Sequence, residues 1–187
     1  MNIKDHITAL EKEIEAKKKE LTALRLELPV TPVEDYELKN PDGTSVRLSE
    51  LFGEYSQMLL IHNMGTGCSY CTLWADGFNS FWPYLKTKCA FVLTSPDPVA
   101  KMAPFVAGRN WDYPVVSLDG TTLTKDFGFA AEWGTNPGVT ALTKHADGSI
   151  TRQAQAEFGP GDDFCAVWPL IDLLPGGQGD WEPNYHK

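Results

Sequence analysis

The first 28 residues carry a hydrophobic stripe with the spacing of a coiled-coil helix. Apolar residues recur alternately four and three positions apart, with only Lys17 interrupting the series, at Ile3, Ile7, Leu10, Ile14, Leu21, Leu24 and Leu28. Such a repeat lies along one side of an α-helix. Pro29 and Pro32 end it, because proline breaks helix interiors. We predict one helix over residues 1–28, which either packs its stripe on its own domain or pairs as an arm with a second subunit.

After these prolines the apolar runs shorten to strand length and alternate with helical patterns. Residues 58–61 and 89–93 are continuous apolar runs, typical of strands covered on both faces. Residues 71–85, between the two runs, and residues 98–108, after the second, carry large apolar side chains at helical spacing. The segment therefore predicts a β-α-β unit followed by a second helix.

Shorter segments complete the predicted sheet. Residues 36–38 and 46–48 flank an Asn-Pro-Asp-Gly turn and predict a hairpin, and residues 139–142 and 149–152 predict another. We also expect a helical turn at Ser49, a short strand at 113–116 and a last helix at 163–174, which a glycine-rich tail follows. Together they predict an α/β domain over residues 29–187, with a mixed sheet covered on both faces.

The composition is that of an ordinary globular protein. The 187 residues are 42% hydrophobic and 22% charged, which suits one domain with its own core. A net charge of −9 has the wrong sign for binding nucleic acid or an anionic membrane surface. No apolar run reaches the roughly 18 residues of a membrane span, and the charged N-terminus lacks the apolar stretch of a signal peptide. We expect a cytoplasmic protein without nucleic-acid or membrane partners.

Two of the four cysteines form a Cys-x-x-Cys pair, Cys68 and Cys71, between a predicted strand and a predicted helix. At a helix start the first sulfur faces unpaired backbone N–H groups, and the second lies one turn further in, within disulfide reach. Cys68 is then the thiolate that attacks a disulfide or a sulfenic acid, and Cys71 resolves the mixed disulfide. Thiol-disulfide exchange is therefore the predicted chemistry, and no cofactor is expected.

Four residues near the pair are candidates for supporting it. Thr66 and Gly67 lie in the tight turn that leaves the first cysteine uncovered. His62, at the end of the preceding strand, either assists deprotonation of that cysteine or simply caps the strand. Asp76 is a weaker candidate, as a proton acceptor for the second cysteine.

Two further candidates have plainer structural alternatives. Trp74 either shapes the rim of the site or belongs to the core. Pro137, just before a predicted strand, is either a loop proline or a proline beside the cysteines, where a cis peptide bond is one of the options.

A metal site at the pair is an alternative to exchange chemistry, as are two idle thiols. Zinc requires four ligands, and the remaining candidates are neither paired nor spaced as a second binding knuckle: His62, Cys89, His145 and Cys165. Cys89 and Cys165 fit better as small core residues. We therefore assign no metal ligand.

The order of residues resembles a family of thioredoxin-like proteins described as predicted dithiol-disulfide oxidoreductases, related to the alkyl hydroperoxide reductase and thiol-specific antioxidant group. The resemblance covers nearly the whole chain and is most specific at residues 68–76, Cys-Ser-Tyr-Cys-Thr-Leu-Trp-Ala-Asp. It also includes Leu28-Pro29, Asp35-Tyr36, residues 48–52, His62-Asn63-Met64, Asp126-Phe127-Gly128, Pro137-Gly138 and Leu173-Leu174-Pro175. It implies a three-layer α/β/α thioredoxin fold with an added N-terminal helix and a dithiol site at Cys68 and Cys71, and it names no substrate.

Some features depart from this family or resemble others. Asn63 stands where an aromatic residue is expected after the histidine, and the stretch before Cys68 is short, so partner choice could differ. Ser69-Tyr70 resembles glutaredoxins, which keeps glutathione or a bridging iron-sulfur cluster as a minor alternative. Peroxiredoxins have a threonine, a proline and then the peroxidatic cysteine, and no proline lies between His62 and Cys68. Peroxidase activity therefore ranks low.

We predict a thiol-disulfide oxidoreductase that acts on protein or small-molecule disulfides through Cys68 and Cys71. One alternative is a non-catalytic thioredoxin-like binding or dimerisation protein, in which residues 3–28 form the homodimer surface. The other is a metal or iron-sulfur site at the cysteine pair.

Overall fold

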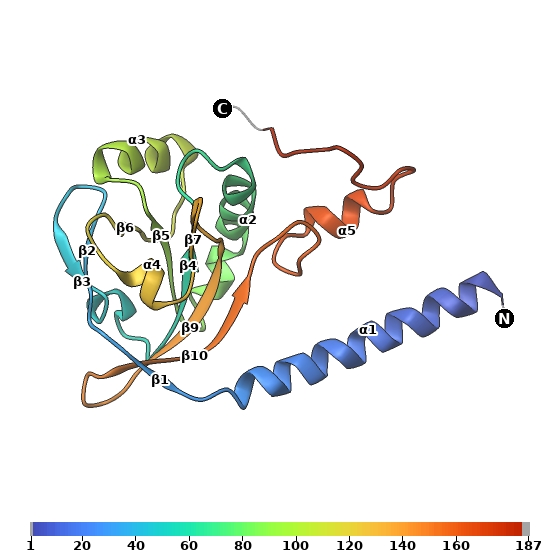
Figure 1. Ribbon diagram of the computed structural model, residues 1–187, viewed down its shortest axis with the longest axis horizontal. Coiled ribbons are helices and arrows are strands. Elements are labelled where there is room, and N and C mark those ends of the chain that lie inside the picture. The colour runs from blue at the N-terminus through green and yellow to red at the C-terminus, as the bar shows by residue number, and fades with distance from the viewer. Residues whose placement is uncertain (1, 185–187) are drawn as a thin grey trace.

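An eight-stranded mixed sheet forms the centre of this computed structural model, which describes residues 2–184 (Figure 1). The strands lie in the order β1-β10-β9-β4-β5-β6-β2-β3. Their bounds are β1 Thr31–Val33, β2 Glu37–Lys39, β3 Ser45–Arg47, β4 Gln57–His62, β5 Ala90–Ser95, β6 Val115–Ser117, β9 Gly138–Lys144 and β10 Ile150–Glu157. Strands β4, β5 and β6 run parallel, and all other pairs are antiparallel. A separate small hairpin pairs β7 (Ala130–Ala131) with β8 (Gly134–Thr135).

Helices cover both faces of this sheet. On one face, here the α2 face, lie α2 (Ser69–Leu85), α3 (Val99–Arg109) and α5 (Val167–Ile171); on the other, the α4 face, lie η1 (Glu50–Phe52) and α4 (Leu123–Asp126). Strand β5 serves both cores, because successive side chains of a strand point to opposite sides. Phe91 and Leu93 join the core under α2, whereas Ala90 and Val92 join the other. The predicted three-layer α/β/α fold is confirmed.

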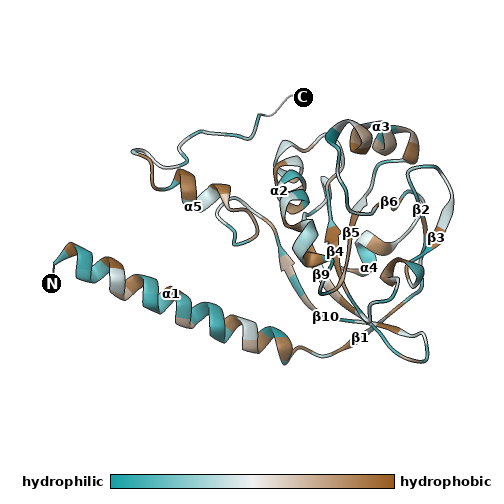
Figure 2. Ribbon diagram, turned by 180° about the vertical axis from the view of Figure 1, so that it is seen from behind, coloured by the Kyte–Doolittle hydropathy of each residue, from teal (hydrophilic) through white to brown (hydrophobic). Residues whose placement is uncertain are grey.

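Helix α1 (Ile3–Leu26) stands out from the domain and buries none of its residues (Figure 1). Its apolar stripe faces solvent, with exposed fractions from 45% at Leu28 to 75% at Ile3, and Figure 2 shows brown positions among teal ones along the helix. The structure thus contradicts the alternative in which the stripe packs on its own domain. Within residues 2–184, neither α1 nor any other helix is long and apolar enough to cross a membrane.

Two sets of polar side-chain contacts tie α1 and the residues just after it to the rest of the domain. The Lys18 ammonium lies 2.5 Å from a carboxylate oxygen of Asp163, and both side chains are exposed. The Gln153 amide donates to the carbonyl oxygens of Leu26 and Leu28, at 2.6 and 3.1 Å. An exposed ion pair contributes at most about 1 kcal/mol, so these contacts orient the helix without giving it a core.

The last predicted helix was too long, and its start was misplaced. Residues 163–166 lie outside α5, in a turn in which the Asp162 side chain accepts hydrogen bonds from the backbone N–H groups of Phe164 and Cys165. Helix α3 also runs one residue beyond the predicted stop, to Arg109, and Asn110 caps it with a φ of 55°, the left-handed conformation typical of a helix end. Residue 1 of the first predicted helix and residues 185–187 of the tail lie outside the described range.

Candidate active site

Cys68 and Cys71 lie at the start of α2, directly beyond the carboxyl end of β4. Cys68 is the N-cap of α2, with an extended backbone, and its Sγ accepts the backbone N–H of Cys71 at 3.2 Å. Cys68 is half-buried, whereas Cys71 is buried in the core under α2. Both are free thiols. A helix start offers backbone donors that no residue inside the helix can use, so the outer sulfur has stabilising partners and remains reachable.

The two sulfurs have opposite acidities. The Cys71 thiol donates a hydrogen bond to the Cys68 sulfur, and with the backbone N–H groups of Cys71 and Tyr70 it lowers the pKa of Cys68 to about 6, although burial opposes this. The same hydrogen bond, burial and the neighbouring negative charge raise the pKa of Cys71 far above its ordinary value. Near pH 7 Cys68 is therefore a thiolate and Cys71 a protonated donor to it.

The loop before Cys68 is held from a neighbouring strand end. Asp97, just after β5, accepts the Thr66 backbone N–H at 2.6 Å and forms a 2.7 Å ion pair with Lys101. Gly65 has a φ of +95°, and a Cβ built there would lie 2.7 Å from a carboxylate oxygen of Asp97. Glycine is thus required for both the backbone conformation and the close approach.

Met64 brings a third sulfur to the pair. Its Sδ lies 3.9 Å from the Cys68 Sγ, and its backbone N–H donates to the Cys71 Sγ at 3.4 Å. Both Met64 and Asp97 were absent from the sequence-based candidates. Asp97 could have been found from the sequence, because it follows a buried strand that is parallel to β4, and the carboxyl ends of such strands meet at one edge of a sheet.

A cleft of about 680 Å³ opens next to the start of α2. It is lined by Thr66, Gly67 and Ser69, the neighbours of Cys68 in the chain, although Cys68 itself is not a lining residue. Its apolar walls come from α2, α3, the following loop and the C-terminal tail, and include Leu73, Phe105, Trp111, Trp181 and Pro183. The space is large enough for a substituent of a substrate disulfide next to the reacting sulfur.

Asp76 lies on the wall of this cleft, and its carboxylate is hydrogen-bonded to residues other than the cysteines. Its carboxylate accepts hydrogen bonds from the Arg109 guanidinium, including Nε at 3.1 Å, and from the Trp111 indole N–H at 2.9 Å. Within residues 2–184 no hydrogen bond joins it to Cys71. The structure therefore gives no support to Asp76 as the proton acceptor for that thiol.

His62 faces away from the cysteines. Its ring stacks on Phe129 at 3.9 Å between centroids, and its Nε2 lies 2.8 Å from the Thr140 hydroxyl. Both contacts lie on the side of the sheet opposite α2, as the pleat of β4 requires. Burial, with the charge of Arg152, lowers the pKa of His62 to about 3, so the ring is neutral at physiological pH. The expectation that His62 assists deprotonation of Cys68 is therefore wrong, because the ring lies on the other face of the sheet and its low pKa makes it a poor base.

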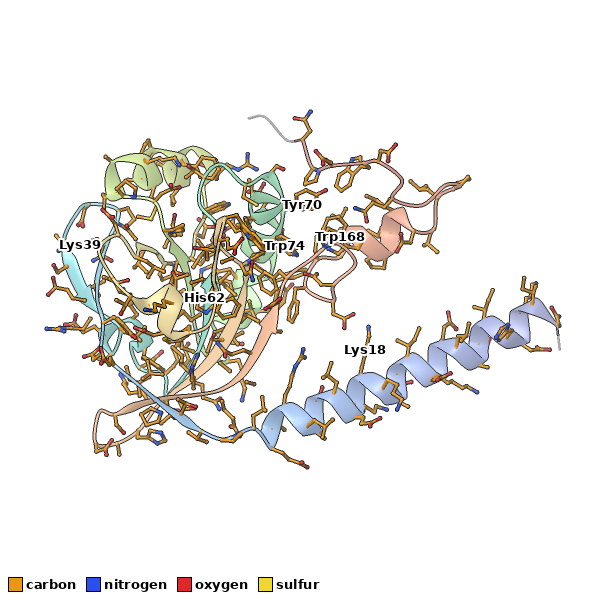
Figure 3. All side chains as sticks on the ribbon, in the orientation of Figure 1. Lys18, Lys39, His62, Tyr70, Trp74 and Trp168 are labelled. Carbon is orange, nitrogen blue, oxygen red and sulfur yellow. The ribbon has the colours of Figure 1, made fainter. Side chains whose placement is uncertain are left out.

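Trp74 belongs to an aromatic cluster beneath the site. It is 3% exposed and packs with Tyr70 and Trp168 between α2 and α5 (Figure 3). Of its two sequence-based alternatives, the structure shows the core one. Pro137 borders the same narrow space as Cys71, and its peptide bond is trans, like every other within residues 2–184.

The other two cysteines lie in different parts of the chain. Cys89 precedes β5 and therefore lies at the opposite end of the sheet from Cys68, whereas Cys165 lies in the loop before α5 and belongs to the same core as Cys71. Burial raises the pKa of each thiol. Across the part of the chain that the structure describes, no three His, Cys, Asp or Glu side chains gather as metal ligands.

Comparison with solved structures shows which proteins share this fold. The chain is 25% identical to the peroxidoxin BcpB of Mycobacterium tuberculosis, with a TM-score of 0.54, covering 68% of this chain and 86% of that one. A peroxiredoxin Q mutant of Xanthomonas campestris is 18% identical, with a TM-score of 0.54 and coverage of 66% and 80%. A hypothetical protein of Sinorhizobium meliloti 1021 is 13% identical, with a TM-score of 0.50 and coverage of 76% and 80%.

The comparison with curated proteins found no match. The predicted relationship to thioredoxin-like proteins of the peroxide-reductase group is confirmed by the structural neighbours. One protein family, described as bacterial protein of unknown function (DUF899), matches residues 2–186. Because this match spans nearly the whole sequence, the chain belongs to the DUF899 family.

Proposed function

We propose that this protein is a thiol-disulfide oxidoreductase with Cys68 as nucleophile and Cys71 as resolving thiol. The observation that carries the proposal is the half-buried Cys68 sulfur at the start of α2, which accepts hydrogen bonds from a buried second thiol and from backbone. Redox relatives with the same fold support it. A low-pKa, reachable sulfur beside a protected thiol is the arrangement that exchange requires.

The reaction proceeds in two displacements. The Cys68 thiolate attacks one sulfur of a substrate disulfide, the substrate S–S bond breaks, and the leaving sulfur takes up a proton. Cys71 then loses its proton and attacks the mixed disulfide at Cys68, which releases the second substrate thiol and leaves a Cys68–Cys71 disulfide. Two electrons pass to the substrate.

The mixed disulfide itself makes Cys71 more acidic. Its pKa is raised first by the hydrogen bond to Cys68, then by burial and by the Cys68 charge. Once Cys68 is bonded to the substrate, its charge is gone and its sulfur is a poorer acceptor. Two of the three causes are thereby reduced, and the resolving thiol becomes available when it is needed.

The walls of the cleft favour substrate disulfides that carry an apolar or aromatic group next to the reacting sulfur. Leu73, Phe105 and Trp111 give it apolar walls, and Trp181 extends them from the tail. Such walls favour a peptide or organic disulfide over a small polar one, because burying the substituent removes apolar surface from water. We therefore propose protein or small-molecule disulfides as substrates.

Thiol trapping with peptide mass spectrometry across dithiothreitol redox buffers tests this function. We expect a reversible Cys68–Cys71 disulfide with a midpoint between roughly −270 and −120 mV, the range of working thiol exchangers. Cys71→Ser should accumulate mixed disulfides with a model substrate, and Cys68→Ser should form none. Equal exchange activity in the two variants would refute the assignment.

Peroxide reduction is a second candidate, favoured by the peroxiredoxin neighbours. One X. campestris neighbour is described by its alkyl peroxide reduction activity. In that chemistry the Cys68 thiolate attacks a peroxide oxygen, the O–O bond breaks, an alcohol leaves with a proton, and Cys68 becomes a sulfenic acid. Cys71 then forms the disulfide and releases water. Consumption of cumene hydroperoxide with dithiothreitol, compared between the wild type and Cys68→Ser, decides whether this activity is present.

We also propose that α1 is an arm that pairs with the α1 of a second copy of this chain. Its exposed stripe has no partner within residues 2–184, and the charges beside the stripe indicate a parallel arrangement. In a parallel pair Glu13 faces the partner's Lys18, and Glu20 faces the partner's Arg25.

An antiparallel pair has poorer electrostatics. It would bring Glu13 opposite the partner's Glu20, and Lys4 opposite the partner's Arg25. Lys18 can exchange Asp163 for the partner's Glu13 at little cost, because the Lys18–Asp163 pair is exposed. Lys17 remains as one polar layer within an otherwise apolar stripe.

A further inference from the structure

Three sulfur atoms meet at the start of α2, two from the cysteine pair and one from Met64. The Met64 Sδ lies 3.9 Å from the Cys68 Sγ, and the Met64 backbone N–H bonds the Cys71 Sγ at 3.4 Å. The Cys68 Sγ accepts the backbone N–H of Cys71 at 3.2 Å. Disulfide exchange uses only two of the three, so the thioether has no part in the proposed reaction.

We propose that the reduced protein binds one Cu(I) ion through Cys68, Cys71 and Met64. The sulfur spacing suits such an ion. A metal–sulfur bond of about 2.3 Å, the zinc-thiolate value, holds trigonal sulfur ligands about 4.0 Å apart, which is close to the observed Met64–Cys68 separation. Met64 and Cys68 therefore already have the separation that two ligands of one such ion require.

The donor types select Cu(I) over zinc and over an iron-sulfur cluster. Thiolate together with thioether is a soft set that favours Cu(I). Structural zinc requires four ligands from Cys, His or carboxylate, and the described residues contain no cluster of three such side chains. A cluster bound by one chain needs four cysteines, and Cys89, one of the four in the chain, lies at the opposite end of the sheet from this pair.

The loop before Cys68 and the core under α2 hold Met64, the third ligand, in place and leave the site open to solvent. Met64 and Cys68 are both half-buried and pack against the core under α2. The loop between them is fixed by the 2.6 Å bond from Thr66 to Asp97 and by the 2.7 Å bond from the Gly65 N–H to the Asn63 side chain. A preorganised loop avoids the cost of ordering ligands on binding.

Binding changes no oxidation state. Two Cu–thiolate bonds and one Cu–thioether bond form, and any proton still carried by the cysteine thiols is released to solvent. The ion and the Cys68–Cys71 disulfide exclude each other, because the disulfide uses both thiolates. Copper loading therefore protects the pair from oxidation.

Competition between the reduced full-length protein and the chromogenic Cu(I) chelator bicinchoninate tests the proposal, with X-ray absorption to count sulfur neighbours. We expect one Cu(I) per chain with three sulfur neighbours. Even outer partners of a metal site change affinity by about 10- to 100-fold, so Met64→Leu should weaken binding at least roughly tenfold and leave two sulfurs. Its backbone N–H, and thus the contact to Cys71, is retained.

A matched control is Met58→Leu, in which a buried methionine of β4 changes in the same way in the core of the α4 face, to which neither Met64 nor Cys68 belongs. It should bind like the wild type, and Cys68→Ser should bind no Cu(I). The proposal is overturned if the wild type retains no copper against the chelator, or if Met64→Leu binds as tightly as the wild type with the same number of sulfurs. Disulfide trapping in metal-free buffer is a separate measurement, so failure here leaves the exchange function standing.

Discussion

Cys68 and Cys71 are the same chemical group three residues apart, yet their positions give them different roles. The outer sulfur collects donors at a helix start, and the inner one supplies the strongest of them. Removing that donor should therefore make Cys68 less acidic. Their acidities follow from hydrogen-bond direction, since a donor stabilises the charged form of its acceptor.

The pH dependence of Cys68 alkylation checks this relationship. In metal-free buffer, the rate of reaction with iodoacetamide should rise with pH around a midpoint near 6. Cys71→Ala removes a hydrogen bond to a charged group, worth about 1.5–3 kcal/mol, so the midpoint should move up by about one to two pH units. Cys165→Ala should leave it in place, and an unmoved midpoint in Cys71→Ala would contradict the hydrogen-bond assignment.

His62 should make the fold sensitive to acid. Its pKa is lowered from 6.5 to about 3 by burial and by Arg152, so between these pH values the unfolded chain binds a proton that the folded chain does not. The free energy of unfolding should then fall as pH falls, by up to about 1.4 kcal/mol per pH unit. Urea unfolding from pH 7 to pH 4 should show a shallower dependence for His62→Gln, and parallel curves would rule out this contribution.

Gly65 should tolerate no side chain. At a φ of +95° with Asp97 2.7 Å from the added Cβ, Gly65→Ala should lower the free energy of unfolding by about 1–2 kcal/mol or more. Gly67→Ala is the matched control, because its Cβ would meet nothing within 4 Å and its φ is ordinary. Thermal unfolding of both variants gives the comparison, and equal losses would argue against the Asp97 contact.

At the scale of elements, α1 differs from every other long helix in having no buried residue. Most helical stability in proteins comes from packing an apolar face, and α1 has such a face without a surface to pack on. A second copy of the helix is the partner that its heptad spacing fits. Pairing would therefore stabilise α1 as well as join two chains.

Sedimentation of two single variants tests this arm. Ile14→Asp places a charge in the stripe, whereas Ala16→Asp places the same charge on the opposite side of the helix. We expect a dimer for the wild type and for Ala16→Asp, and a monomer for Ile14→Asp. Lys17→Leu should strengthen the dimer, since it replaces the polar layer. A monomeric wild type at high protein concentration would exclude the arm.

Across the whole molecule, the sheet separates the reactive cysteine pair from Cys89. Cys68 stands beyond the carboxyl end of β4, and Cys89 before the amino end of the parallel β5. These positions are separated by the length of a six-residue strand, roughly 20 Å. No disulfide can bridge that distance, because its Cα atoms must lie within about 7 Å.

Differential alkylation tests this separation. In the native protein Cys68 should be labelled first, while Cys89 and Cys165 should be labelled only after guanidinium unfolding, since burial raises the pKa of both thiols. Under mild oxidation the 68–71 disulfide should form alone. A disulfide that includes Cys89 in folded protein would contradict the arrangement of the sheet.

Local sequence patterns were enough for the features that depend on neighbours in the chain. The spacing and runs of apolar residues placed α1, α2, α3 and most strands of the sheet within a few residues, and the Cys-x-x-Cys between a buried strand and a helix predicted a pair at a helix start. The short elements β1, α4, β7 and β8 were not predicted, and the last helix is shorter than its apolar spacing indicates. Short elements contain too few residues for a periodic pattern to be recognised.

The contacts that each side chain makes across the fold follow from the three-dimensional arrangement and not from local patterns. The pleat of β4 sends His62 to the face away from the cysteines, and Arg109 and Trp111 from another segment engage Asp76. The loop geometry brings the Met64 sulfur to Cys68, and α1 leaves its own domain. These outcomes rest on contacts between residues far apart in the chain or on the path of the backbone, and hydrophobic spacing constrains neither.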